Sequence, residues 1–146
     1  PTHHETRVLP YSAHQMFDLV ADVRSYPQFL PWTAATRISS ENTTDDHTVM
    51  LADLVVSFKV FRETFASKVT MWPTKHQIDT SYIEGPFKHM ESRWVFRDID
   101  GGVEVVFDVD FEFKNRLLQS AAGMFFNQAM QTIVRAFETR AQELYG

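Results

Sequence analysis

Residues 102–113 read Gly-Val-Glu-Val-Val-Phe-Asp-Val-Asp-Phe-Glu-Phe, and this stretch decides the fold class. Its odd-numbered positions from Val103 to Phe113 are all apolar, whereas four of the even-numbered positions are acidic: Glu104, Asp108, Asp110 and Glu112. Successive side chains of a strand point to opposite faces, so this alternation is typical of a half-buried antiparallel strand. One face of the strand therefore needs an apolar partner elsewhere in the chain.

The same two-residue period continues upstream of this strand. Residues 90–97 alternate in the same way, and Asp100-Gly101-Gly102 joins the two runs. We expect both glycines to supply the positive φ angles of a tight hairpin. Earlier periodic or extended runs bring the expected total to about seven strands, and they lie at residues 5–9, 36–40, 52–58, 65–71 and 78–82.

After the last strand the period changes from 2 to about 3.6 residues. We predict one long helix from Leu117 to Leu144, about 40 Å long at 1.5 Å per residue. The stripe expected to face the sheet contains Leu118, Ala122, Phe125, Ala129, Ile133 and Ala136, and it is widened by Phe126, Met130 and Phe137. Two short helices are predicted near the start of the chain, one at residues 13–20 capped by Ser12 and one at residues 23–26 that ends before Pro27.

The order of elements is one strand, two short helices, six strands and one long helix. An antiparallel sheet with one apolar face must bury that face on the helix, so the fold class is α+β. We predict a helix-grip (START-like) fold, in which a curved antiparallel sheet of about seven strands surrounds the long C-terminal helix. A chain of 146 residues has the size of one domain, and we expect a single domain over residues 1–146.

Composition excludes several classes of function. A net charge of −5 argues against DNA as a partner, because nucleic-acid affinity depends on Lys and Arg. The absence of cysteine excludes disulfides and thiolate metal sites. The six histidines lack metal-binding spacing, and the adjacent His3-His4 pair is expected at a frayed end. We therefore expect no metal, no cofactor and no catalytic residue, and hence no enzyme.

No apolar run approaches the ~20 residues of a membrane span, and the first residues lack the apolar region of a signal peptide. The expected location is the cytoplasm, with peripheral contact at the inner membrane.

The small residues Ala122 and Ala129 lie among bulky ones on the helix, which predicts a hydrophobic cavity between helix and sheet. The apolar loop residues 29–32, Phe-Leu-Pro-Trp, are expected to form a lid or membrane-facing lip at its mouth. The predicted cavity residues are Phe29, Leu30, Trp32, Leu54, Val56, Phe58, Glu63, Phe65, Tyr82, Trp94, Phe107, Ala122, Phe125 and Ala129. The alternative is that the 13 Phe, 6 Met and 3 Trp pack a core without a cavity.

Glu63 is the charged member of this set. It shares the phase of Phe65 and Ser67, which would aim its carboxylate at the inner face of the sheet. The alternative is a bulge between Lys59 and Arg62 that turns Glu63 towards solvent.

Three segments carry a family resemblance over nearly the whole chain. Residues 11–23 read Tyr-Ser-Ala-His-Gln-Met-Phe-Asp-Leu-Val-Ala-Asp-Val and are followed by Tyr-Pro-Gln-Phe-Leu-Pro-Trp at 26–32; the second segment is Phe-Ala-Ser-Lys-Val-Thr at 65–70, and the third is Gly85-Pro86-Phe87-Lys88 leading to Trp94-Val95-Phe96. Together they resemble the coenzyme Q-binding START-domain family, within the polyketide cyclase/dehydrase and lipid-transfer superfamily. One departure is Thr33, where the family often has cysteine.

The resemblance implies a carrier or chaperone that binds a polyprenyl quinone (ubiquinone) and supports respiratory electron transport without catalysis. The superfamily also contains a bacterial ribosome-association toxin, for which the implied partner is the large ribosomal subunit. That alternative needs a basic surface, for which Lys59, Arg62, Lys68 and Lys75 are candidates. A cyclase-like enzyme is the third alternative, and it needs an acid/base pair lining the cavity.

Overall fold

The structure is a computed structural model that describes residues 1–58 and 61–146. Its elements follow the predicted order, and they are β1 (Thr2–Leu9), α1 (Ala13–Ala21), the 3₁₀ helix η1 (Val23–Gln28), β2 (Thr33–Thr43), β3 (Thr48–Phe58), β4 (Phe61–Trp72), β5 (Gln77–Glu84), β6 (Phe87–Ile99), β7 (Gly102–Phe113) and α2 (Arg116–Tyr145). The seven strands form one antiparallel sheet in the order β1-β7-β6-β5-β4-β3-β2. The predicted helix-grip fold is confirmed.

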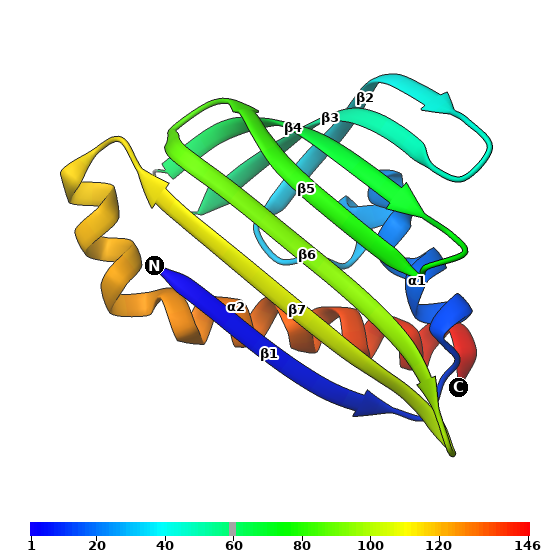
Figure 1. The fold of residues 1–146 in the computed structure, drawn as a ribbon. Coiled ribbons are helices and arrows are strands. Elements are labelled where there is room, and N and C mark those ends of the chain that lie inside the picture. The colour runs from blue at the N-terminus through cyan, green and yellow to red at the C-terminus, as the bar shows by residue number, and fades with distance from the viewer. Residues whose placement is uncertain (59–60) are drawn as a thin grey trace.

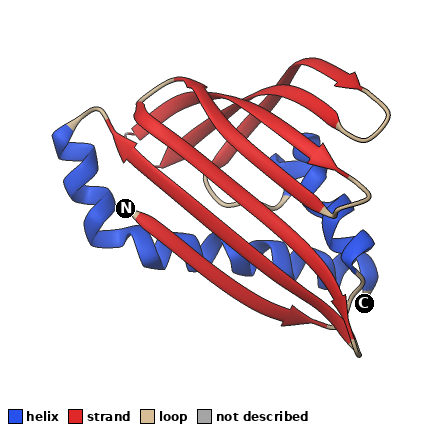
Figure 2. Cartoon of the chain, viewed as in Figure 1, coloured by secondary structure: helices blue, strands red, loops and turns tan. Residues whose placement is uncertain are grey.

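The sheet is curved, and α2 lies across its concave side (Figures 1 and 2). Strands β2 to β7 pair in chain order as a meander. Strand β1 is the exception, because it pairs with β7, from Thr2↔Asp110 to Leu9↔Val103. This pairing places β1 beside α2, and α1 lies at the end of the sheet where α2 finishes (Figure 1). Helix α2 therefore crosses beneath β1 and β7, and the β2 to β4 side extends beyond it.

Helix α1 begins as its sequence predicts. Ser12 accepts a hydrogen bond from the Gln15 N–H at 3.1 Å, and the Gln15 side chain accepts one from the Ser12 N–H at 3.0 Å. This capping box satisfies two donors that a helix start would otherwise leave unpaired. The prediction that η1 ends before Pro27 is wrong, because η1 continues to Gln28. A proline φ near −65° suits a 3₁₀ turn, so Pro27 is tolerated inside it.

The β6–β7 hairpin corrects one expectation about glycine. Only Gly101 has a positive φ, at 81°. Gly102 is needed for a different reason, since a Cβ at this position would lie 2.2 Å from the Leu9 carbonyl oxygen. The absence of a side chain at Gly102 thus allows the end of β1 to approach the start of β7.

Two clusters of buried side chains attach α2 to the sheet. The larger cluster joins α1, the central strands and the second half of α2, and it includes Phe137, which is 3% exposed and lies 5.2 Å from Trp94. The smaller cluster, at the first half of α2, consists of Phe87, Phe111 and Phe126. The helix is therefore fixed at two separate points.

The buried face of α2 is shifted from the centre of the predicted stripe towards its widening residues Phe126 and Phe137. Phe126, Val134, Phe137 and Ala141 are buried, whereas Phe125 is 60% exposed. Phe126 lies 4.7 Å from Phe111 of β7. The prediction that Phe125 faces the sheet is wrong, because apolar residues occupy more than one face of this helix and only its docking on β7 selects among them.

Candidate ligand site

Between the two buried clusters, the concave face of the sheet carries apolar side chains that are only partly covered. Leu54 and Val56 of β3 and Phe65 of β4 are half-buried, and Phe58 is 48% exposed. They share the phase of the buried residues Met50, Ala52 and Val69, and the register places Leu54 opposite Phe65. We call Leu54, Val56, Phe58 and Phe65 the open row.

Tyr82 of β5 lies beside the open row and supplies a polar group. Its ring lies 5.3 Å from that of Phe87, and its hydroxyl oxygen accepts a hydrogen bond from the Phe87 N–H at 3.2 Å. A phenol oxygen that accepts from a backbone N–H keeps its own proton for donation. The site thus contains a hydrogen-bond donor next to apolar surface.

Glu63 belongs to the same face. It is half-buried between the exposed residues Arg62 and Thr64, and it pairs in register with Val56. Among the described residues, none forms an ion pair or hydrogen bond with its carboxylate. The inward orientation of Glu63 stays a prediction that rests on its phase, and the alternative bulge includes Lys59 and Val60, which lie outside the described residues.

Trp94 and Phe107, which the sequence predicts to line the cavity, are buried in the larger cluster. They are 7% and 8% exposed, and their rings lie 4.3 Å apart within the larger cluster. On the helix side, Ala122 and Ala129 are half-buried. The structure brings Phe65 of the open row, Tyr82 and Ala122 together at the smaller cluster. A role in ligand binding for these residues, for Ala129, and for Trp94 and Phe107 stays a prediction.

The loop at residues 29–32 packs on the protein, and its role as a lid or membrane-facing lip stays a prediction. Phe29 lies 5.4 Å from Phe137, with the Arg140 guanidinium 5.3 Å from its ring centre. Leu30 packs against the larger cluster, and Trp32 lies 5.6 Å from Phe58. All four loop residues are half-buried.

Tyr26 fixes the start of this loop. Its hydroxyl donates to the Val20 carbonyl at 2.5 Å, and its ring lies 5.5 Å from Phe137. Burial raises the pKa of the Tyr26 phenol, and the charge of Asp22 raises it further. The phenol is therefore neutral and serves as a structural donor.

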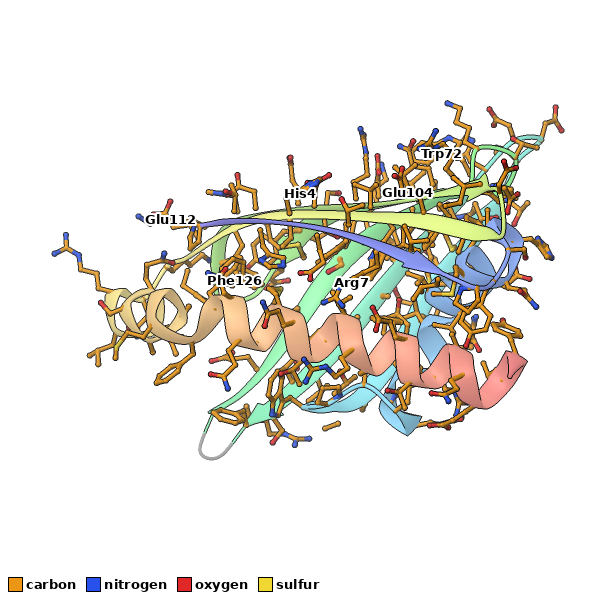
Figure 3. All side chains as sticks on the ribbon, turned by 90° about the horizontal axis from the view of Figure 1, so that it is seen from below. His4, Arg7, Trp72, Glu104, Glu112 and Phe126 are labelled. Atoms are coloured by element: carbon orange, nitrogen blue, oxygen red, sulfur yellow. The ribbon has the colours of Figure 1, made fainter. Side chains whose placement is uncertain are left out.

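Sequence reasoning missed a polar cluster on the inner side of β1, which we call the β1 charge cluster: His3, Glu5, Arg7 and Glu138 of α2. His3 Nε2 lies 2.5 Å from Glu5 Oε2, and Arg7 Nη2 donates to Glu5 Oε1 at 2.7 Å. Arg7 Nη1 lies 3.3 Å from Glu138 Oε1, an ion pair without hydrogen-bond alignment. Arg7 points towards α2 and His4 points to the opposite side of the sheet in Figure 3.

The expectation of a frayed end at His3 is wrong, because its side chain is 9% exposed and its ring meets Phe126 at 5.7 Å. Burial by itself raises the pKa of the Glu5 carboxyl, but the hydrogen bonds from His3 and Arg7 and the charge of Arg7 outweigh it, so the pKa lies below its ordinary value. Both phases of β1 are mainly polar, so periodicity gave no signal for which of them faces inward.

Two hollows on the surface lie apart from the concave face. One, of about 750 Å³, crosses the outer face of β5, β6, β7 and β1, where Arg93 donates to Asp79 at 2.8 and 2.9 Å. The other, of about 330 Å³, lies between the loop at residues 29–32 and α2. Neither is the interior cavity that the sequence predicts, and that cavity stays a prediction that rests on the open row.

In the described part of the chain, no three His, Asp or Glu side chains converge as metal ligands. Within the same residues, no helix is long and apolar enough to cross a membrane.

Comparisons with known proteins agree with this fold. The model of the family described as polyketide cyclase / dehydrase and lipid transport matches residues 9–138. The ribosome association toxin RatA of Rickettsia prowazekii is 39% identical over 142 residues, which cover 95% of this chain and 94% of that protein. The mitochondrial coenzyme Q-binding protein COQ10 homolog B of Xenopus laevis is 34% identical over 147 residues, which cover 97% of this chain and 58% of that protein.

A solved structure, that of an 18 kDa protein from Caulobacter crescentus, superimposes on the chain with a TM-score of 0.84 and 34% identity, covering 100% of this chain and 99% of that one. Sequence and fold therefore agree over nearly all residues, and the chain belongs to the polyketide cyclase/dehydrase and lipid transport family.

Proposed function

We propose that this protein binds a polyprenyl quinone, such as ubiquinone, between α2 and the concave face of the sheet and carries it without changing it. The open row is the observation that supports this function. Partly covered apolar side chains facing a helix leave apolar surface for a ligand to bury, at about 25 cal/mol per Å². Ligand sites of this kind are mainly apolar and contain a few oriented polar groups.

The polar groups near the open row suit the head group of a quinone. A quinone carbonyl accepts hydrogen bonds, and the Tyr82 hydroxyl is a donor beside the open row. A pocket of about 300–1,000 Å³ holds a quinone ring and the first isoprene units but not a long tail. The tail leaves the site past Phe58, which is 48% exposed.

The comparisons support a binding function rather than a chemical one. The relative from Xenopus laevis is named for binding coenzyme Q, and the relative from Rickettsia prowazekii is named for ribosome association. Neither name describes a reaction, and we assign no bond-making step to this chain.

The test is mass spectrometry of organic extracts from the purified protein, followed by titration with a short-tail ubiquinone. Ala122→Trp places a large ring beside Phe65 and Tyr82, which pack with Ala122 on the smaller cluster, and we expect it to weaken quinone binding at least about tenfold. The matched control is Ala121→Trp on the exposed face of the same helix, which should bind as the wild type does. Equal affinity of both variants, or extracts without any apolar ligand, contradict the proposal.

Ribosome association is the second candidate, because the similarity to RatA extends over 94% of that protein. The basic residues it needs lie partly on the outer face of β4, where Arg62 and Lys68 are exposed. Lys75 lies over the Trp72 ring at 5.6 Å, and Lys59 lies outside the described residues. Sedimentation with large ribosomal subunits tests this candidate, and Arg62→Glu with Lys68→Glu should abolish it if these cations make the contact.

A further inference from the structure

The first half of α2 carries an exposed apolar face in addition to its buried one. Leu117, Met124 and Phe125 are 81%, 77% and 60% exposed, and Ala121 is also exposed. These positions follow the spacing i, i+4, i+7 and i+8, which places them on one side of a helix. We call these four residues the outer stripe. The buried stripe beside it contains Phe126.

The segment that carries the outer stripe contains charged residues of one sign only. No Asp or Glu occurs from Phe113 to Phe137, in a chain that contains 19 acidic residues. Lys114 and Arg116 stand at the start of the helix, and Asn115 caps it by accepting hydrogen bonds from the N–H groups of Leu117 and Leu118 at 2.8 and 3.3 Å. Within the described residues, neither Lys114 nor Arg116 has an ion-pair partner.

An apolar stripe beside cations is the composition of a helix that lies in the surface of a membrane. An anionic bilayer complements both parts, because basic residues gain energy near anionic headgroups while apolar side chains enter the acyl boundary. Two cations are few for a nucleic-acid contact, where several phosphates must be neutralised. Large exposed apolar residues gathered in one place mark an interaction site rather than ordinary surface.

We propose that the outer stripe, flanked by Lys114 and Arg116, docks this protein on an anionic bilayer. The proposal rests on the proposed function, since a quinone carrier must exchange its ligand with a membrane. The first turns of α2 are set at an angle to the rest of the helix, at the end of the sheet away from α1 (Figure 1). Docking there presents the smaller cluster and the adjoining concave face to the bilayer. The membrane contact expected for residues 29–32 is thereby assigned to α2.

A label at Met124 tests the docking directly. The chain has no cysteine, so Met124→Cys accepts one environment-sensitive fluorophore, and Leu144→Cys is the matched control on the same helix, at 51% exposure. With vesicles of phosphatidylethanolamine and phosphatidylglycerol, we expect a blue shift of emission for the Met124 label and none for the Leu144 label. A shift of equal size at both positions, or at neither, overturns the proposal.

Vesicle flotation measures the strength of docking. We expect Leu117→Gln with Met124→Gln to lower the partition coefficient about tenfold or more, because two large apolar side chains no longer enter the bilayer. Lys114→Glu with Arg116→Glu should remove the preference for phosphatidylglycerol over phosphatidylcholine. The Leu144→Gln control should float as the wild type does. The proposal is overturned if the Leu117 and Met124 variant floats as the wild type does. It is also overturned if this variant keeps its vesicle binding and instead loses binding to ribosomal subunits or to a second copy of the chain.

Delivery of ubiquinone from cyclodextrin, without membranes, separates this proposal from the proposed function. The Leu117→Gln and Met124→Gln variant should take up quinone as the wild type does if the outer stripe only docks the protein. Normal flotation with no quinone uptake refutes the proposed function alone, and normal uptake with flotation unaffected by the variant refutes the docking alone.

Discussion

Phe125 and Phe126 are adjacent in sequence and differ sharply in environment, which makes them a matched pair for truncation. Phe126 is 7% exposed and packs on Phe111 at 4.7 Å and on His3 at 5.7 Å. Phe125 is 60% exposed. The same change, Phe→Ala, therefore removes a buried contact at one position and mainly solvated surface at the next.

The expected magnitudes follow from burial. Phe126→Ala should lower the free energy of unfolding by about 3–5 kcal/mol, because it removes a buried ring and leaves a cavity. Phe125→Ala loses less than half of the ~1.5–3 kcal/mol of full burial, and alanine regains up to about 0.5 kcal/mol of helix propensity. The net cost at Phe125 is thus about 0–1 kcal/mol.

Thermal and urea unfolding of the two variants and the wild type measure this difference. At about 2–4 °C per kcal/mol for a chain of this size, Phe126→Ala should lower Tm by about 6–20 °C and Phe125→Ala by no more than about 4 °C. Equal destabilisation of the two variants, or a larger effect at Phe125, would refute the assignment of Phe126 to the buried stripe.

Three further predictions concern the elements around the site. Glu5→Gln should make the free energy of unfolding depend less on pH in the acid range. The folded-state pKa of Glu5 lies below its ordinary 4.5, so the stability that its carboxylate contributes is present above pH 4.5 and is lost as the pH falls through the lower folded-state value. Urea unfolding midpoints between neutral and acid pH measure this dependence. Tyr26→Phe should cost about 1–3 kcal/mol in urea unfolding, because it leaves the Val20 carbonyl without its donor, and an unchanged midpoint would contradict this role. Gly102→Ala should destabilise the pairing of β1 with β7, since the new Cβ meets the Leu9 carbonyl oxygen, and faster amide exchange along β1 is the measurement.

Much of the fold could be predicted because its signals are local. The alternation from Val103 to Phe113 fixes a strand with one apolar face, and the change of period after it fixes the long helix. The N-cap at Ser12 also appears as predicted, because it depends only on residues close to it in the chain. The concave location of Leu54, Val56 and Phe65 followed from phase alone.

The sequence by itself thus determined the elements, their order and the apolar face of each strand, since a period of two allows only two choices. Tertiary structure alone decided which face of α2 is buried, because its first half is apolar on two sides and docking on Phe111 selects Phe126 over Phe125. Tertiary structure also decided that β1 turns the polar side chains of Glu5 and Arg7 inward. Which face of β1 points inward depends on its pairing with β7 and on Glu138 of α2, more than a hundred residues away in the chain. Contacts between distant segments leave no periodic trace in either segment.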